Sequence, residues 1–162
     1  MSRGEGIYPD VGRQTPAEGA HIFLGQPNIF FVTVNAKHAV SWMANEAVQK
    51  SLMEIWSEEA TAWLVGYYLI MPDHLHFFCA PHDLHVGIDQ WVEFWKRQFS
   101  RRHLDQTWAW QRKSFHHRMR NSIEYEEKLA YVRENPLRKG LVSKPEDWIY
   151  QGRIHDIKWT TG

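Results

Sequence analysis

The chain has a single cysteine, Cys79, and it has no long uninterrupted run of apolar residues. One cysteine cannot form a disulfide within the chain, and it cannot supply a cluster of thiolate metal ligands. The longest apolar stretch, Ala62 to Met71, is much shorter than the ~18 residues that a membrane span needs. Residues 1–20 lack the apolar segment of a secretion signal. These absences predict a cytoplasmic protein that does not contact a membrane.

The chain also lacks an excess of either charge, because 19 Lys and Arg residues balance 19 Asp and Glu residues. Proteins that bind DNA through its phosphates usually carry a basic excess. The charges are unevenly distributed, however, and a basic segment contains only one acid, Asp105. Its basic residues are Lys96, Arg97, Arg101, Arg102, Arg112, Lys113, Arg118 and Arg120. A local cluster can bind DNA while the chain stays neutral, although an ordinary solvated surface is an equal alternative.

Aromatic residues and a histidine are interleaved with these cations. Aromatic rings beside cations can stack on unpaired bases, so we expect Trp108 and Trp110 to be exposed and to contact DNA. Most of the nine tryptophans are expected in the core instead. His117 could orient a phosphate or assist proton transfer, but a surface histidine without such a role is the simpler interpretation.

The length of the chain is that of one domain, which we expect over residues 21–162 after a flexible arm at residues 1–20. Apolar patterns predict strands over 29–34, 63–70 and 74–80, with a weaker strand over 115–119. They predict helices over 44–60 and 86–103, and a third helix that starts after Asn121 and ends near Asn135. Glu124 is placed to complete a capping box with Asn121. This order predicts an α+β fold, in which helices pack on an antiparallel sheet of four to five strands in a ferredoxin-like split βαβ arrangement.

Two histidines, His74 and His76, lie two residues apart on the third predicted strand. Because side chains alternate along a strand, both imidazoles point to the same face. A pair so placed can bind one divalent metal, and imidazole suits Zn, Fe, Ni and Cu. The spacing alone is a weak signal, since two hydrogen-bonded structural histidines would look the same.

Two segments together give a more specific signature. MPDHLHFFCAP, residues 71–81, and LAYVRENPLRKGLV, residues 129–142, resemble the REP-associated tyrosine transposases of the His-hydrophobe-His (HUH) nuclease superfamily. Members of that family carry a Met-Pro-Asp/Glu/Asn-His-hydrophobe-His element and a later Tyr-x-x-x-Asn-Pro-hydrophobe-basic-x-Gly element. The resemblance implies an HUH-type fold and the cleavage and rejoining of single-stranded DNA near hairpins.

The resemblance also implies roles for individual residues. Tyr131 takes the position of the nucleophile, which forms a covalent 5′-phosphotyrosine, and Asn135 is the candidate third metal ligand beside His74 and His76. The metal of the family is generally Mg or Mn, and the partner is single-stranded or hairpin DNA. One tyrosine makes one cut, so complete excision needs either a homodimer or two rounds of reaction.

The helix geometry agrees with this assignment. At 100° per residue, Tyr125, Leu129 and Val132 share one face and are the expected core contacts, whereas Tyr131 lies well off that face. Tyrosines in helices usually pack in the core, so this position favours a functional residue. Three hypotheses remain open: an active single-tyrosine transposase, a domesticated hairpin-binding protein with little catalysis, and a metal hydrolase that uses water.

Overall fold

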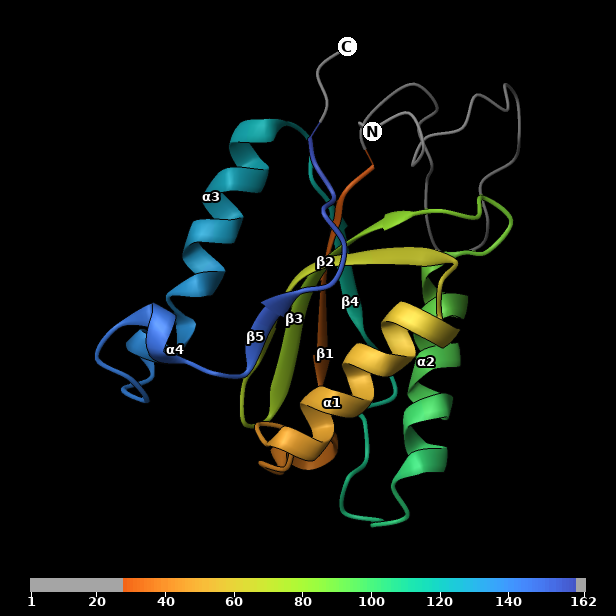
Figure 1. The fold of residues 1–162 in the computed structure, drawn as a ribbon, viewed down its shortest axis with the longest axis vertical. Coiled ribbons are helices and arrows are strands. Elements are labelled where there is room, and N and C mark those ends of the chain that lie inside the picture. Colours follow the sequence, from red (N-terminus) through yellow and green to blue (C-terminus); the bar gives the residue numbers. More distant parts are fainter. Residues whose placement is uncertain (1–27, 160–162) are drawn as a thin grey trace.

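The computed structural model describes residues 28–159, and the predicted arm at residues 1–20 lies outside them. The elements follow the chain from β1 to β5, as drawn in Figure 1. The strands are β1 (Phe30–Asn35), β2 (Trp63–Ile70), β3 (His74–Pro81), β4 (Phe115–Arg118) and β5 (Gln151–Arg153), and the α-helices are α1 (Glu46–Glu54), α2 (Ile88–Arg102), α3 (Ser122–Arg133) and α4 (Asn135–Arg138). None of these helices is long and apolar enough to cross a membrane.

The five strands form one antiparallel sheet in the order β4-β1-β3-β2-β5. The first four strands have the order of a split βαβ sheet. β1 and β2 are connected through α1, and β3 lies between them in the sheet. β5 extends this sheet at the free edge of β2. The predicted α+β fold, with helices packed on an antiparallel sheet, is therefore confirmed.

The sheet separates two apolar layers. α1 and α2 cover one face, and α3 covers the other (Figure 1). Along β3, the alternating side chains of Leu75, Phe77 and Cys79 enter the α1 and α2 layer, whereas Phe78 and Ala80 enter the α3 layer. His74 and His76 have the same parity as Phe78, so they lie on the face that α3 covers.

The start of α3 is fixed by its N-cap. The side chain of Asn121 accepts a hydrogen bond from the backbone amide of Glu124 at 2.8 Å, which satisfies one of the free amides of the first turn. The predicted reciprocal bond is shifted, because the Glu124 carboxylate accepts from the amide of Arg120 at 2.6 Å. The capping box is thus displaced by one residue.

Two elements were not predicted. The chain continues beyond α3 into the single turn α4, in which Pro136 occupies the first turn, where a missing amide costs nothing. Gly140 follows with φ of 72°, a left-handed conformation that glycine adopts without strain and that commonly ends a helix. β5 has only three residues, and its sequence has no apolar alternation. Helix 44–60 is also not α-helical throughout, since its last part, Ile55–Glu59, is a π-turn.

Candidate active site

The two histidines are the first and third residues of β3, at the end of the sheet where β3 follows the turn from β2. Their ring centroids are 4.7 Å apart. His74 Nδ1 donates to the carboxylate of Asp73 at 2.8 Å, and His76 Nδ1 shares a hydrogen bond of 2.9 Å with the hydroxyl of Thr33 on β1. Each imidazole is therefore held through Nδ1, the arrangement that leaves Nε2 for a metal ligand bond.

His76 lies in a less polar environment than His74. Its ring stacks on that of Phe31 at 5.1 Å. Burial, together with the nearby charges of His74 and Lys128, lowers the pKa of His76 to about 3. His76 is consequently neutral near pH 7, and only a neutral imidazole can coordinate a metal.

One cavity of about 420 Å³ brings the distant sequence motifs together. Its lining residues come from β1, β3, α3 and α4 and include all four candidate catalytic and metal-binding residues. They are Phe31, His74, His76, Lys128, Tyr131, Val132, Asn135, Arg138 and Lys139. The segments 71–81 and 129–142 therefore meet at a single place, as the resemblance implies.

The orientation of α3 places the tyrosine at the opening of this cavity. Tyr125 and Val132 are buried, with 4% and 2% of their surface exposed, whereas Tyr131 is 60% exposed. The predicted apolar face of this helix is confirmed, because Leu129 also packs against the same apolar layer. The phenol of Tyr131 is therefore accessible to a large substrate such as DNA.

Two cations that the sequence did not single out flank the tyrosine. The guanidinium of Arg138 lies 3.8 Å from the centroid of the Tyr131 ring, and it donates to the Tyr131 carbonyl oxygen at 2.6 Å and to Oδ1 of Asn135. The ammonium of Lys128 lies 6.0 Å from the Tyr131 centroid and 5.2 Å from that of Phe31. Signals for both were present, since Arg138 is the basic position of the Tyr-x-x-x-Asn-Pro element and Lys128 precedes Tyr131 by one helical turn.

Two imidazoles and one amide of this cavity are the candidate donors for a metal. Among residues 28–159, no group of three or more His, Cys, Asp or Glu side chains is arranged to hold a metal ion. Nε2 of His74 and of His76 and Oδ1 of Asn135 fit such an ion, because an amide oxygen has two lone pairs and can accept from Arg138 while it coordinates. A metal here would keep open positions for phosphate oxygens or water.

Several residues that were predicted to contact DNA lie away from this cavity or are bonded to other groups of the protein. Lys96 is 5% exposed, and its ammonium donates to the carbonyl oxygens of Gln111 and Arg112 at 3.1 and 3.4 Å, so it is not part of the exposed basic surface. The prediction that Trp108 and Trp110 are exposed is wrong. Both are partly buried against the core, where Trp108 stacks on Trp42 at 5.6 Å and Trp110 packs edge-on against Trp95 at 5.3 Å.

The remaining basic residues fall into two groups. Arg97, Arg101 and Arg112 line a groove of about 760 Å³ between α2 and the segment 103–112, on the α1 and α2 side. Arg102 there is bound to Glu54 and Glu59.

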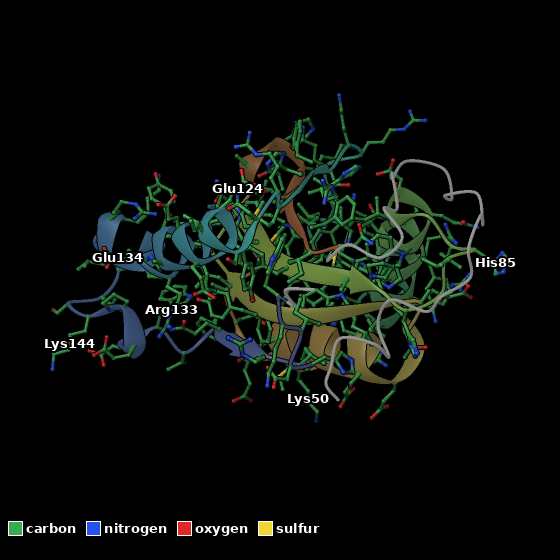
Figure 2. All side chains as sticks on the ribbon, turned by 90° about the horizontal axis from the view of Figure 1, so that it is seen from above. Lys50, His85, Glu124, Arg133, Glu134 and Lys144 are labelled. Carbon is green, nitrogen blue, oxygen red and sulfur yellow. The ribbon has the colours of Figure 1, made fainter. Side chains whose placement is uncertain are left out.

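The second group lies on β4 and on either side of it in the sequence. Arg118 pairs with Phe30 and Lys113 precedes the strand. His117 and Arg120 contact Glu124 at 3.2 and 3.1 Å, and Figure 2 shows Glu124 at the end of α3 opposite to Glu134. The strand register and the contacts with Glu124 place His117 and Arg120 on the same face of the sheet as the histidine pair.

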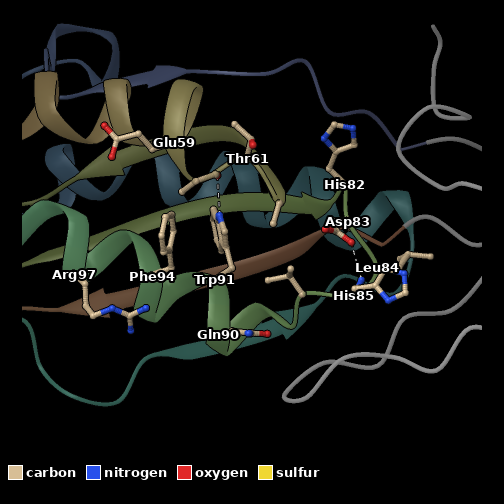
Figure 3. Close-up of a pocket in the computed structure, with 13 residues that line it drawn as sticks. Glu59, Thr61, His82, Asp83, Leu84, His85, Gln90, Trp91, Phe94 and Arg97 are labelled. Atoms are coloured by element: carbon tan, nitrogen blue, oxygen red, sulfur yellow. Dashed lines mark hydrogen bonds between the residues drawn. The ribbon is translucent and has the colours of Figure 1, made fainter.

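A separate cavity of about 720 Å³ lies in the other layer (Figure 3). It is bordered by Glu59, by the segment His82–Val86 and by Trp91, Phe94 and Arg97 of α2. The indole of Trp91 donates to the carbonyl oxygen of Ala60 at 2.9 Å, so this wall is part of the structural core. None of the four candidate catalytic and metal-binding residues lines this cavity.

The fold is similar to that of a solved transposase structure. No protein-family model and no curated protein matches the chain. The structure is similar to that of a REP-associated tyrosine transposase bound to a REP hairpin, with a TM-score of 0.65, 18% identity, and coverage of 82% of this chain and 80% of that chain. A second match, to a protein of Deinococcus radiodurans R1 with a provisional transposase assignment, has a TM-score of 0.46 at 15% identity and covers 72% of this chain and 96% of the other. The first similarity establishes the shared fold.

Proposed function

We propose that the chain is a REP-associated tyrosine transposase, a metal-dependent endonuclease and strand transferase that cleaves single-stranded DNA near hairpins. The observation that carries this proposal is the 420 Å³ cavity lined by His74, His76, Tyr131 and Asn135. These residues come from two motifs more than fifty residues apart, which folding has brought to one place. The transposase fold supports the same conclusion.

The metal site of this enzyme would consist of His74, His76 and Asn135. Mg or Mn is expected from the family resemblance. A divalent ion held there supplies Lewis-acid stabilisation of the charge that develops on the scissile phosphate. Asp73 and Thr33 orient the imidazoles, because each fixes the Nδ1 atom of one ring. His76 contributes a neutral ring whose position is further restricted by Phe31.

Tyr131 would perform the covalent step. Its hydroxyl oxygen forms a bond to phosphorus while the bond from phosphorus to the 3′ oxygen breaks, and the phenolic proton is finally carried by the released 3′-hydroxyl. The energy of the phosphodiester is kept in the 5′-phosphotyrosine, so a 3′-hydroxyl can reverse the step and rejoin strands. Arg138 and Lys128, which flank the ring, provide positive charge where the phosphate must lie.

The proposed substrate is a DNA hairpin with a single-stranded extension. The similar solved structure contains a REP hairpin, and the cavity here opens at an exposed tyrosine rather than in a closed pocket. Two chains, or two successive reactions, would be needed for complete excision because each chain offers one such tyrosine.

The decisive experiment is a search for the covalent adduct. The protein is incubated with a labelled hairpin oligonucleotide with single-stranded extensions in the presence of Mn, and the products are separated on a denaturing gel. We expect a protein–DNA adduct that is lost with EDTA and in Tyr131→Phe, and retained in Tyr150→Phe, which alters a tyrosine outside the cavity.

Each other outcome identifies a different function. An adduct that persists in Tyr131→Phe contradicts the assignment of the nucleophile. Cleavage without an adduct favours the metal hydrolase with a water nucleophile, and binding without cleavage favours the domesticated hairpin-binding protein.

A further inference from the structure

Phe115 is an exposed aromatic residue on an otherwise well-packed sheet. It begins β4 and is 50% exposed, whereas Phe30, Phe77, Phe78 and Phe99 are almost completely buried. β4 is the outer strand of the sheet on the β1 side. Half of the surface of Phe115 contacts water, so the ring is accessible to a partner, and its position in the sheet decides which partner it can reach.

The strand register places Phe115 in line with the candidate metal site. Phe115 pairs with Thr33 of β1, and Thr33 pairs with His76 of β3. Directly opposed residues of antiparallel strands point to the same face. Two strand spacings of about 4.8 Å separate the backbone of Phe115 from that of His76, a distance of roughly 10 Å. Only the small side chain of Thr33, which is bonded to His76, lies between the two rings in this row.

Positive charge accompanies the exposed ring. The ammonium of Lys113 lies 5.7 Å from the Phe115 centroid. His117 lies two residues further along the same face of β4, and 56% of its side chain is exposed. An accessible aromatic face beside cations is the combination with which proteins bind single strands, because the ring stacks on a base while the cations follow the phosphates.

We propose that Phe115 is a stacking platform for a base of single-stranded DNA close to the scissile phosphodiester, with Lys113 at the adjoining phosphate. This inference rests on the proposed function for the location of the cleaved bond. It replaces Trp108 and Trp110, whose indoles pack against the core, as the aromatic component of the DNA surface. The single strand would run along β4 and β1 toward the histidine pair.

The test measures the affinity for DNA without cleavage. In a Tyr131→Phe background, the affinity for a fluorescein-labelled single-stranded oligonucleotide of mixed sequence is determined by anisotropy. We expect Phe115→Ala to bind about 5- to 150-fold more weakly, the range observed when one base–aromatic stack is removed. Phe115→Trp should bind at least as tightly as the parent, and Phe115→Leu should resemble Phe115→Ala because leucine has no aromatic face.

Salt dependence separates stacking from charge and from misfolding. Phe115→Ala should lower the affinity by the same factor at each salt concentration, whereas Lys113→Gln should reduce the slope of log affinity against log salt by about 0.7. Ile149→Ala provides the matched control, since Ile149 is an exposed apolar residue, 69% accessible, just before β5 at the opposite edge of the sheet. It should bind like the parent.

The outcomes for the two proposals are distinguishable. An affinity of Phe115→Ala equal to that of the parent, or an equal loss in Phe115→Trp, overturns the stacking platform. If wild-type protein forms no adduct while the Phe115 series behaves as expected, the strand-transfer function fails and the single-strand platform stands. If the adduct forms and all Phe115 variants bind DNA as tightly as the parent, only the stacking platform is contradicted.

Discussion

The two faces of the sheet are built differently. The face under α1 and α2 is filled by tryptophans, and Trp56, Trp63, Trp91 and Trp95 are all essentially inaccessible and contact one another or the same phenylalanine. The face under α3 has a smaller apolar layer, beside which the histidine pair and its cavity lie. We therefore expect the first face to supply most of the stability, whereas the other can tolerate the space, polar groups and charges that a reaction needs.

The largest loss of stability is expected in the tryptophan layer under α1 and α2. Trp95→Ala should lower the free energy of unfolding by about 3–5 kcal/mol, because a fully buried indole is replaced by a cavity. Urea denaturation followed by circular dichroism measures this loss. Trp148→Ala, on the α3 side and only partly buried, is the matched control and should cost clearly less. Equal losses would show that the two faces contribute alike.

At the histidine pair we expect a large loss of activity and a small loss of stability. His76→Ala should slow adduct formation by more than about 100-fold, since several kcal/mol of transition-state stabilisation depend on a correctly held metal. Its effect on unfolding should be smaller than that of Trp95→Ala. The rate of adduct formation in Mn is the measurement, and His82→Ala, an exposed histidine outside the cavity, should react normally. A normal rate in His76→Ala would exclude His76 as a ligand.

A smaller effect should follow from the residue that orients His76. Thr33→Val removes the hydroxyl bonded to Nδ1 while it retains the shape of the side chain. Loss of such a partner typically reduces metal affinity or activity by about 10- to 100-fold. When adduct formation is titrated with Mn, Thr33→Val should need a higher Mn concentration than the parent. Thr33→Ser should need nearly the same concentration as the parent. Failure of serine to rescue would indicate a packing role for Thr33.

The smallest effect concerns the helix that carries the tyrosine. Asn121→Ala removes the N-cap of α3 and should cost about 1 kcal/mol of stability. Asn121→Asp should be nearly neutral because a carboxylate also caps the first turn. Thermal unfolding of the three proteins measures the difference, and equal stabilities would mean that contacts with the sheet alone hold α3.

The parts of this molecule that the sequence predicts are those with a repeating or chemically demanding pattern. β2 and β3 follow from their apolar composition, and the placement of Tyr131 follows from the face occupied by Tyr125 and Val132. Segment 103–112 has no such pattern. Its two tryptophans, interleaved with Arg112 and followed by Lys113, suggested a surface, but the segment folds over the end of the tryptophan layer, and Lys96 is buried beneath it as a donor to its carbonyl oxygens. Which loop covers a core depends on tertiary packing, and local periodicity contains no information about it.

The same limit applies to the candidate active site. Its two motifs could be recognised because nucleophile and metal ligands need particular residue types at fixed spacings. The supporting residues Phe31 and Thr33 could not, because they are ordinary side chains until β1 lies beside β3 at His76. Tertiary structure is needed to place such supporting groups, which orient the chemistry without performing it.

The reactivity of the Cys79 thiol can be used to measure how readily the sheet opens. It is the only thiol in the chain, it is inaccessible in β3, and burial raises the pKa of the Cys79 thiol, so a folded molecule does not react with an alkylating reagent. Because β3 lies between β1 and β2 in the middle of the sheet, the thiol becomes reactive only when the central strand is exposed. The rate of alkylation therefore measures the free energy of opening at the centre of the sheet, without any added label or engineered residue.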